Sequence, residues 1–151
     1  MRLLFVDDLP SMIKPLVDVI QERNPEWVLD FAGDIRLAWG LLCTNVYDVI
    51  IMDVMLPGWP HVRPRSEGIY LIKWLRVDSA KGVVAQAPRG SPKAENRKAE
   101  VIFLTSRNVV GVKDELREHG LGKLRVIGRL EADEVELFNK LKALVKQRAG
   151  R

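Results

Sequence analysis

The segment that decides the fold is Asp48-Val49-Ile50-Ile51-Met52-Asp53-Val54-Met55-Leu56-Pro57-Gly58. Its residues 49–52 form an unbroken apolar run, which is typical of a strand buried on both faces of a sheet. The run ends at the carboxylate of Asp53, and Pro57-Gly58 mark a turn four residues later. An aspartate at the C-terminal tip of a buried strand lies where open α/β sheets bind their ligands.

Apolar runs on both sides of this segment predict four further strands, at residues 3–6, 27–32, 101–104 and 124–127. Apolar residues at helical spacing predict helices over residues 11–22, 34–42, 66–75, 109–119 and 131–147. Ser11 and Asp34 are the predicted N-caps of the first two helices. The alternation begins with a strand, so it predicts an α/β fold with a doubly wound, five-stranded parallel sheet.

Length and composition are those of one globular domain. The chain has 151 residues, of which 47% are hydrophobic and 29% charged. The single cysteine, Cys43, cannot form an internal disulfide. No apolar run reaches the 18 residues of a membrane span, and Asp7-Asp8 follow the N-terminus too soon for a signal peptide. We therefore expect a cytoplasmic protein that does not bind membranes.

The middle of the chain has a different composition. Residues 58–67 contain two prolines, and residues 78–99 are small, polar and basic. We interpret both segments as insertions into one domain that spans residues 1–151. A basic surface could contact nucleic acid or an acidic partner, but these residues match no nucleic-acid motif. We expect a solvated surface here and no nucleic-acid binding.

Polar side chains follow four of the five predicted strands: Asp7 with Asp8, Asp53, Thr105 and Arg129. Because the strands are parallel, these ends meet at one edge of the sheet. Three carboxylates in one place repel one another, and a hard divalent cation such as Mg²⁺ relieves that repulsion. A hydroxyl and a guanidinium opposite them suit a phosphoryl group, for which an aspartate is a known nucleophile.

The tips Val6-Asp7-Asp8, Met52-Asp53 with Pro57-Gly58, and Leu104-Thr105-Ser106 resemble, in order and spacing, the receiver domain of two-component response regulators. The resemblance covers residues 1–57, 66–77 and 100–148. It implies the flavodoxin-like strand order 2-1-3-4-5. It also implies a stand-alone response regulator in phosphorelay signal transduction, which is a signalling protein and not an enzyme.

The resemblance assigns a role to each residue at the sheet edge. Asp53 accepts a phosphoryl group from a sensor histidine kinase or a phosphotransfer protein. Asp7, Asp8, Asp53 and the backbone carbonyl of Met55 bind Mg²⁺. Thr105 binds a phosphoryl oxygen and links phosphorylation to a loop shift that changes binding of a downstream protein partner.

Three positions depart from the receiver pattern. Receivers carry a lysine, usually followed by proline, after the last strand, whereas this chain has Arg129-Leu130. The aromatic residue that commonly precedes that lysine on the strand is replaced by Val126. The Asp-Gly pair that usually follows the proline is matched by Glu67-Gly68, which the first insertion displaces.

These departures leave two alternatives open. One is a receiver-derived scaffold that binds partners without phosphorylation. The other is a Mg²⁺-dependent phosphohydrolase with an aspartate nucleophile, although such enzymes carry Asp-x-Asp on the first strand and this chain has adjacent Asp7-Asp8. Trp59 could cover the site or meet a partner. The sequence does not identify the kinase or the output, and a homodimer stays open.

Overall fold

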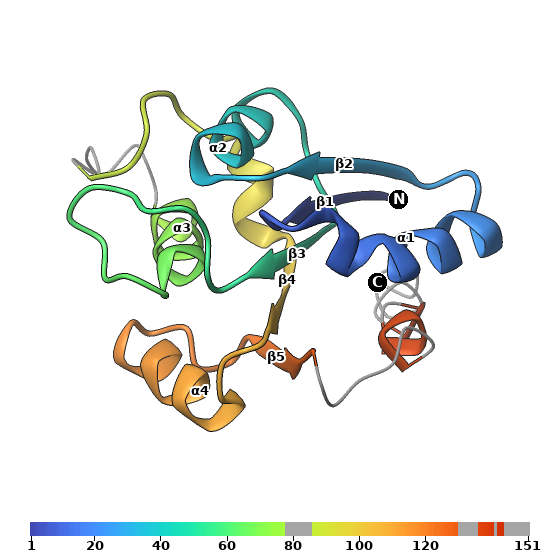
Figure 1. Ribbon diagram of the computed structural model, residues 1–151. Helices are drawn as coiled ribbons and strands as arrows, with labels where there is room; N and C mark the ends of the chain where they lie inside the picture. Colours follow the sequence, from blue (N-terminus) through green and yellow to red (C-terminus); the bar gives the residue numbers. More distant parts are fainter. Residues whose placement is uncertain (78–85, 130–135, 141, 144–151) are drawn as a thin grey trace.

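The computed structural model describes residues 1–77, 86–129, 136–140 and 142–143. Five parallel strands form one sheet in the order β2-β1-β3-β4-β5, which confirms the predicted fold class and strand order (Figure 1). The strands are β1 (Arg2–Val6), β2 (Val28–Ala32), β3 (Val49–Asp53), β4 (Glu100–Thr105) and β5 (Arg125–Gly128).

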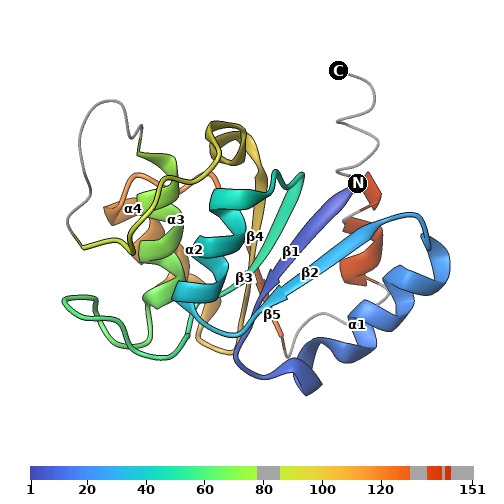
Figure 2. The same cartoon turned by 90° about the horizontal axis from the view of Figure 1, so that it is seen from above.

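Helices cover both faces of the sheet (Figure 2). α2, α3 and α4 pack on one face, and α1 packs on the other together with Leu137 and Phe138 of a short helical stretch at residues 136–140. The bounds are α1 (Pro10–Arg23), α2 (Ile35–Thr44), α3 (Glu67–Arg76), a 3₁₀ helix η2 (Ala94–Lys98) and α4 (Val109–Glu118). The predicted helix over residues 131–147 lies partly outside the described residues.

The central strands are buried on both sides. Ile50 and Met52 face the core under α2, α3 and α4, whereas Val49 and Ile51 face the core under α1. All four are at most 4% exposed. This two-sided burial is the reason that the segment reads as continuous apolar sequence and not as alternation.

Helix starts agree only partly with the prediction. Asp34 caps α2 as expected, because its carboxylate accepts the Leu37 N–H at 2.8 Å. The predicted Ser11 cap is wrong: α1 begins at Pro10, with Leu9 in the N-cap position and no side-chain cap. Proline suits the first turn because its missing N–H would have no intrahelical partner there.

The segment before β4 is attached to α2 by buried hydrogen bonds. Asn96, fully buried in η2, donates to the carbonyls of Leu42 and Asn45, each at 2.8 Å, and accepts the Tyr47 N–H at 2.8 Å. The Trp39 indole donates to the carbonyl of Gly90 at 3.1 Å. Residues 78–85 of the second predicted insertion lie outside the described residues. None of the described helices is long and apolar enough to cross a membrane.

Candidate functional site

Strand register brings the predicted acids together. Val6 pairs with Met52 across β1 and β3, so Asp7 and Asp53 continue side by side at the carboxyl edge of the sheet. One oxygen from each of Asp7, Asp8 and Asp53 lies within 4.8 Å of the others. Asp7 and Asp53 are 6% and 7% exposed, and Asp8 is open to solvent.

Backbone N–H groups hold two of these carboxylates in place. Asp7 Oδ1 accepts the N–H of Leu9 at 2.8 Å, and Asp53 Oδ1 accepts the N–H of Met55 at 3.2 Å. Each bond spans two residues, so each aspartate folds its following loop back towards itself. The predicted role of the Met55 carbonyl as a metal ligand stays a prediction.

The environment of Asp53 disfavours the charged form of its carboxyl group. Burial raises the pKa of Asp53 from 3.8 to about 6, and the charge of Asp8 adds to the rise, while the Met55 N–H opposes it. A carboxylate whose pKa is raised by burial and by a like charge is stabilised in its charged form by an added positive charge. The all-oxygen donor set and the short separations fit a hard divalent cation such as Mg²⁺.

Arg129 is a cation already inside the cluster. Its N–H donates to the Thr105 carbonyl at 2.9 Å, which places the residue just beyond β5. Its guanidinium Nη2 is ion-paired with Asp7 Oδ2 and lies 3.6 Å from Asp53 Oδ2, and the side chain is only 10% exposed. Burial lowers the pKa of Arg129, but a guanidinium stays charged in proteins.

Thr105 ends β4 at the same edge and is fully buried. Its Oγ1 accepts the N–H of Arg107 at 2.9 Å, so the hydroxyl is tied to the loop that leads into α4. The structure therefore places Asp7, Asp8, Asp53, Thr105 and Arg129 at the ends of strands along one edge of the sheet. Their predicted chemical roles are not tested by this geometry.

Glu67-Gly68 close the loop that follows β3. The Gly68 N–H donates to the Val54 carbonyl at 2.9 Å, and a Cβ on Gly68 would lie 2.0 Å from the Asp53 carbonyl oxygen. Glu67, 3% exposed, accepts the N–H groups of Leu56 at 3.1 Å and Arg65 at 2.9 Å. The sequence predicted that the first insertion displaces this pair. It did not predict that Glu67 forms hydrogen bonds with both ends of the inserted loop.

A buried ion pair next to Thr105 was missed by the sequence analysis. Arg107 Nη1 lies 3.1 Å from Glu115 Oε2 of α4, and it donates to the Arg65 carbonyl at 2.9 Å and to Ser66 Oγ at 3.0 Å. Burial acts to raise the pKa of Glu115, but hydrogen bonds from Ser66 and Arg107 outweigh it, and the pKa is lowered. No sequence pattern links these residues, because they come from separate loops and helices.

Trp59, which follows Pro57-Gly58, lies against α2. Its indole donates to the Gln86 carbonyl at 2.7 Å, and the Arg36 guanidinium lies over its ring at 5.4 Å from the centroid. The inserted loop therefore extends from the carboxylate cluster to the face of α2.

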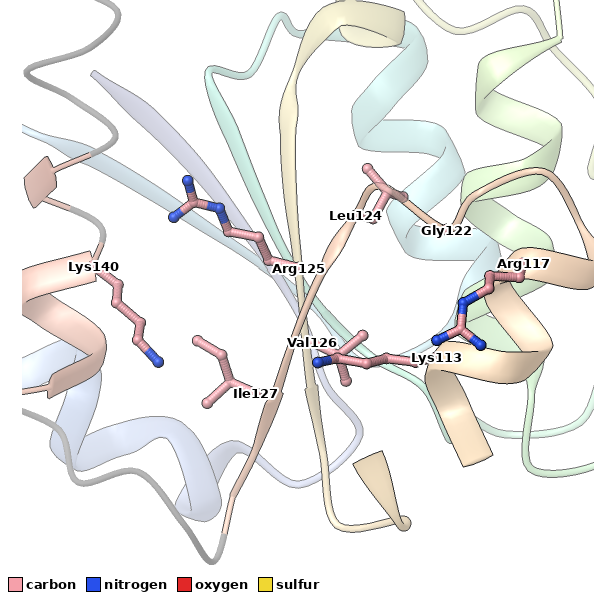
Figure 3. Close-up of a pocket in the computed structure, with 8 residues that line it drawn as sticks. All are labelled: Lys113, Arg117, Gly122, Leu124, Arg125, Val126, Ile127 and Lys140. Atoms are coloured by element: carbon pink, nitrogen blue, oxygen red, sulfur yellow. The ribbon is translucent and has the colours of Figure 1, made fainter. Parts of the chain in front are cut away.

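A basic hollow of about 470 Å³ lies beside α4 and β5 (Figure 3). Arg125, Val126 and Ile127 of β5 form one side of it, and Lys113 and Arg117 of α4 form another. Lys140 also lines the hollow. Val126, at the position where receivers commonly carry an aromatic residue, lines this hollow.

Several solved structures with the same fold are response-regulator receiver domains. The receiver domain of the Francisella response regulator 1452 has a TM-score of 0.67 and 23% identity, and the match covers 97% of this chain and 98% of that one. A two-component response regulator from Clostridium difficile gives 0.70 and 16%, with 98% of each chain covered. The chemotaxis response regulator CheY4 of Vibrio cholerae gives 0.67 and 20%, with 95% and 97% covered.

No protein-family model matches the sequence, and no curated protein matches it. At these identities the structural matches show that this chain has the receiver fold.

Proposed function

We propose that this chain is a receiver-type signalling protein in which Asp53 accepts a phosphoryl group. The donor is the phosphohistidine of a sensor kinase or a phosphotransfer protein. The observation that carries the proposal is the meeting of Asp7, Asp8 and Asp53 with Arg129 at the carboxyl edge of a receiver-fold sheet. Open α/β sheets bind their ligands at this edge.

The transfer is an in-line displacement at phosphorus. A carboxylate oxygen of Asp53 forms the new O–P bond while the N–P bond of the phosphohistidine breaks. The electron pair of that bond stays on the imidazole nitrogen, which then takes a proton from water. Mg²⁺ bound by Asp7, Asp8 and Asp53 would neutralise negative charge on the transferred group.

The cation and the hydroxyl at the edge bind the product. Arg129 turns its guanidinium from Asp7 to the oxygens of the new phosphoryl group, which it can grip with two N–H groups. Thr105 donates its hydroxyl to another oxygen and gives up its bond from the Arg107 N–H. The aspartyl phosphate adds negative charge beside these groups and holds them in the new arrangement.

The Arg107–Glu115 pair carries this change to a partner surface. A shift of Thr105 moves Arg107, which contacts Glu115 of α4 at 3.1 Å and also Ser66 at the start of α3. The basic hollow between α4 and β5 lies on the face that such a shift alters (Figure 3). We assign the downstream protein partner to this face.

One observation favours the scaffold alternative. The Arg129 guanidinium already neutralises Asp7 within the cluster, which is the charge that Mg²⁺ would otherwise supply. In that case the fold binds partners through its surface, and Asp53 stays unmodified.

Intact-mass measurement separates the two functions. The full chain is incubated with acetyl phosphate and MgCl₂, alongside the Asp53→Asn variant and a sample with EDTA. The proposed function predicts that the wild-type chain gains one phosphoryl group and that neither of the other samples does. A wild-type chain that is folded by circular dichroism but gains no mass supports the scaffold. Release of many phosphates per chain from a phosphate ester would instead support a phosphohydrolase.

A further inference from the structure

A second hollow, of about 420 Å³, lies between α2, the loop after β3 and residues 87–89. Its volume is in the range of small-molecule sites. It is separate in composition from the carboxylate cluster and from the basic hollow of Figure 3, since it shares no lining residue with either. The two predicted insertions, at residues 58–67 and 78–99, supply four of its seven lining residues.

The walls of this hollow are indole rings held in fixed orientations. Trp39 and Trp59 both line it. Each indole N–H is already bonded to a backbone carbonyl, at Gly90 (3.1 Å) and at Gln86 (2.7 Å). Trp39 is only 4% exposed, so the partly exposed Trp59 ring supplies most of the apolar surface, and neither indole has a free donor. Gly40 leaves room beside the rings because it adds no side chain.

The rim of the hollow is positively charged. Arg36 and Arg89 line it, both are exposed, and none of the lining residues that the structure describes is acidic. The Arg36 guanidinium lies 5.4 Å from the centre of the Trp59 ring. The guanidinium covers one face of the Trp59 ring, so an anion bound to Arg36 lies next to the indole, and a flat ring attached to that anion can pack against the exposed part of Trp59.

We propose that this hollow binds a small planar aromatic anion, with its ring against Trp59 and its phosphate or carboxylate on Arg36 and Arg89. The indoles explain why a bare inorganic anion is a poorer occupant, because it would leave apolar wall in water. The two guanidiniums explain why an uncharged aromatic ring is poorer too. A purine mononucleotide combines both features and fits the volume.

AMP is the probe, and an NMR titration of the full ¹⁵N-labelled chain is the measurement. The four tryptophans report through their indole N–H signals, and Trp59→Phe assigns the signal of Trp59. We expect saturable shifts of the Trp59 and Trp39 signals and none of the Trp27 signal. Adenosine lacks the phosphate, and ribose 5-phosphate lacks the aromatic base. Each should therefore bind at least about tenfold more weakly than AMP.

Charge variants locate the site. Arg36→Gln and Arg89→Gln should each weaken AMP binding by about tenfold, because each removes a charge-assisted hydrogen bond. Lys123→Gln removes one positive charge from the exposed loop before β5 and should bind AMP as the wild type does. Asp53→Asn should also bind AMP normally, which separates this site from the carboxylate cluster.

Several results would overturn the proposal. One is the absence of saturable Trp59 shifts with AMP in the wild-type chain. Another is equal binding of ribose 5-phosphate and AMP, because the indoles would then play no part. A loss of affinity in Lys123→Gln equal to that in Arg36→Gln would mean that net charge alone attracts the nucleotide.

Discussion

Asp53 is a carboxylate that folding removes from water and places beside two other acids. Such an arrangement destabilises the free protein and makes the residue responsive to added positive charge. The charge of Asp53 is therefore expected to lower the free energy of unfolding of the metal-free protein.

Asp53→Asn should stabilise the metal-free protein at neutral pH by about 2 kcal/mol. The folded-state pKa of Asp53, about 6, lies above its ordinary value of 3.8. The folded chain therefore holds the proton of Asp53 more tightly than the unfolded chain does. Protonation of Asp53 stabilises the wild-type fold, and this contribution is full below pH 3.8 and is lost as pH rises through 6. Denaturant unfolding in EDTA should show the gain at neutral pH and almost none below pH 3.8. A gain that is equal at both pH values would contradict the account.

Gly68 is required by a close approach of two backbones. Gly68→Ala should destabilise the fold by about 3 kcal/mol, because its Cβ would lie 2.0 Å from the Asp53 carbonyl oxygen. Gly40→Ala is the matched control, since nothing lies within 4 Å of its Cβ position in α2. The control should be neutral or slightly stabilising in thermal unfolding. Equal losses for both variants would argue against the backbone contact.

At the scale of elements, the strand tips were predictable and the ties between helices were not. Asp7, Asp53, Thr105 and Arg129 follow local apolar runs, and parallel strands must present such ends at one edge. The predicted Ser11 cap was wrong because the apolar pattern does not determine which of several neighbouring residues begins the helix. Arg107 and Glu115 meet only in the folded chain, so no local spacing could reveal their pairing.

Arg107→Gln tests the ion pair and hydrogen bond by which Arg107 connects Glu115 of α4 with Ser66 at the start of α3. The variant leaves the Glu115 carboxylate, 5% exposed, without its closest cation, so we expect a loss of about 2 kcal/mol in the free energy of unfolding. Arg117→Gln breaks the exposed pair with Asp114 on the same helix and should cost less than about 0.5 kcal/mol. Urea unfolding of both variants makes the comparison. Similar small losses would show that the buried pair does not hold α4.

At the scale of the whole molecule, the order β2-β1-β3-β4-β5 places β1, β3 and β4 side by side at the centre of the sheet. That order gathers the tips that carry Asp7, Asp53 and Thr105, and β5 adds Arg129 from the neighbouring position. The inserted segments, in contrast, collect around α2 at Trp59 and Gly90. Their packing could not be predicted, because their composition fits any solvated loop.

Calorimetric titration with MgCl₂ tests whether the three carboxylates form one site for a divalent cation. The wild-type chain should bind one Mg²⁺, and Asp7→Asn and Asp53→Asn should each weaken that binding by at least about tenfold. Lys123→Gln, far along the chain from the cluster, should bind as the wild type does. No binding by the folded wild-type chain, or binding by both aspartate variants as tight as that of the wild type, would contradict a cation site shared by the three carboxylates.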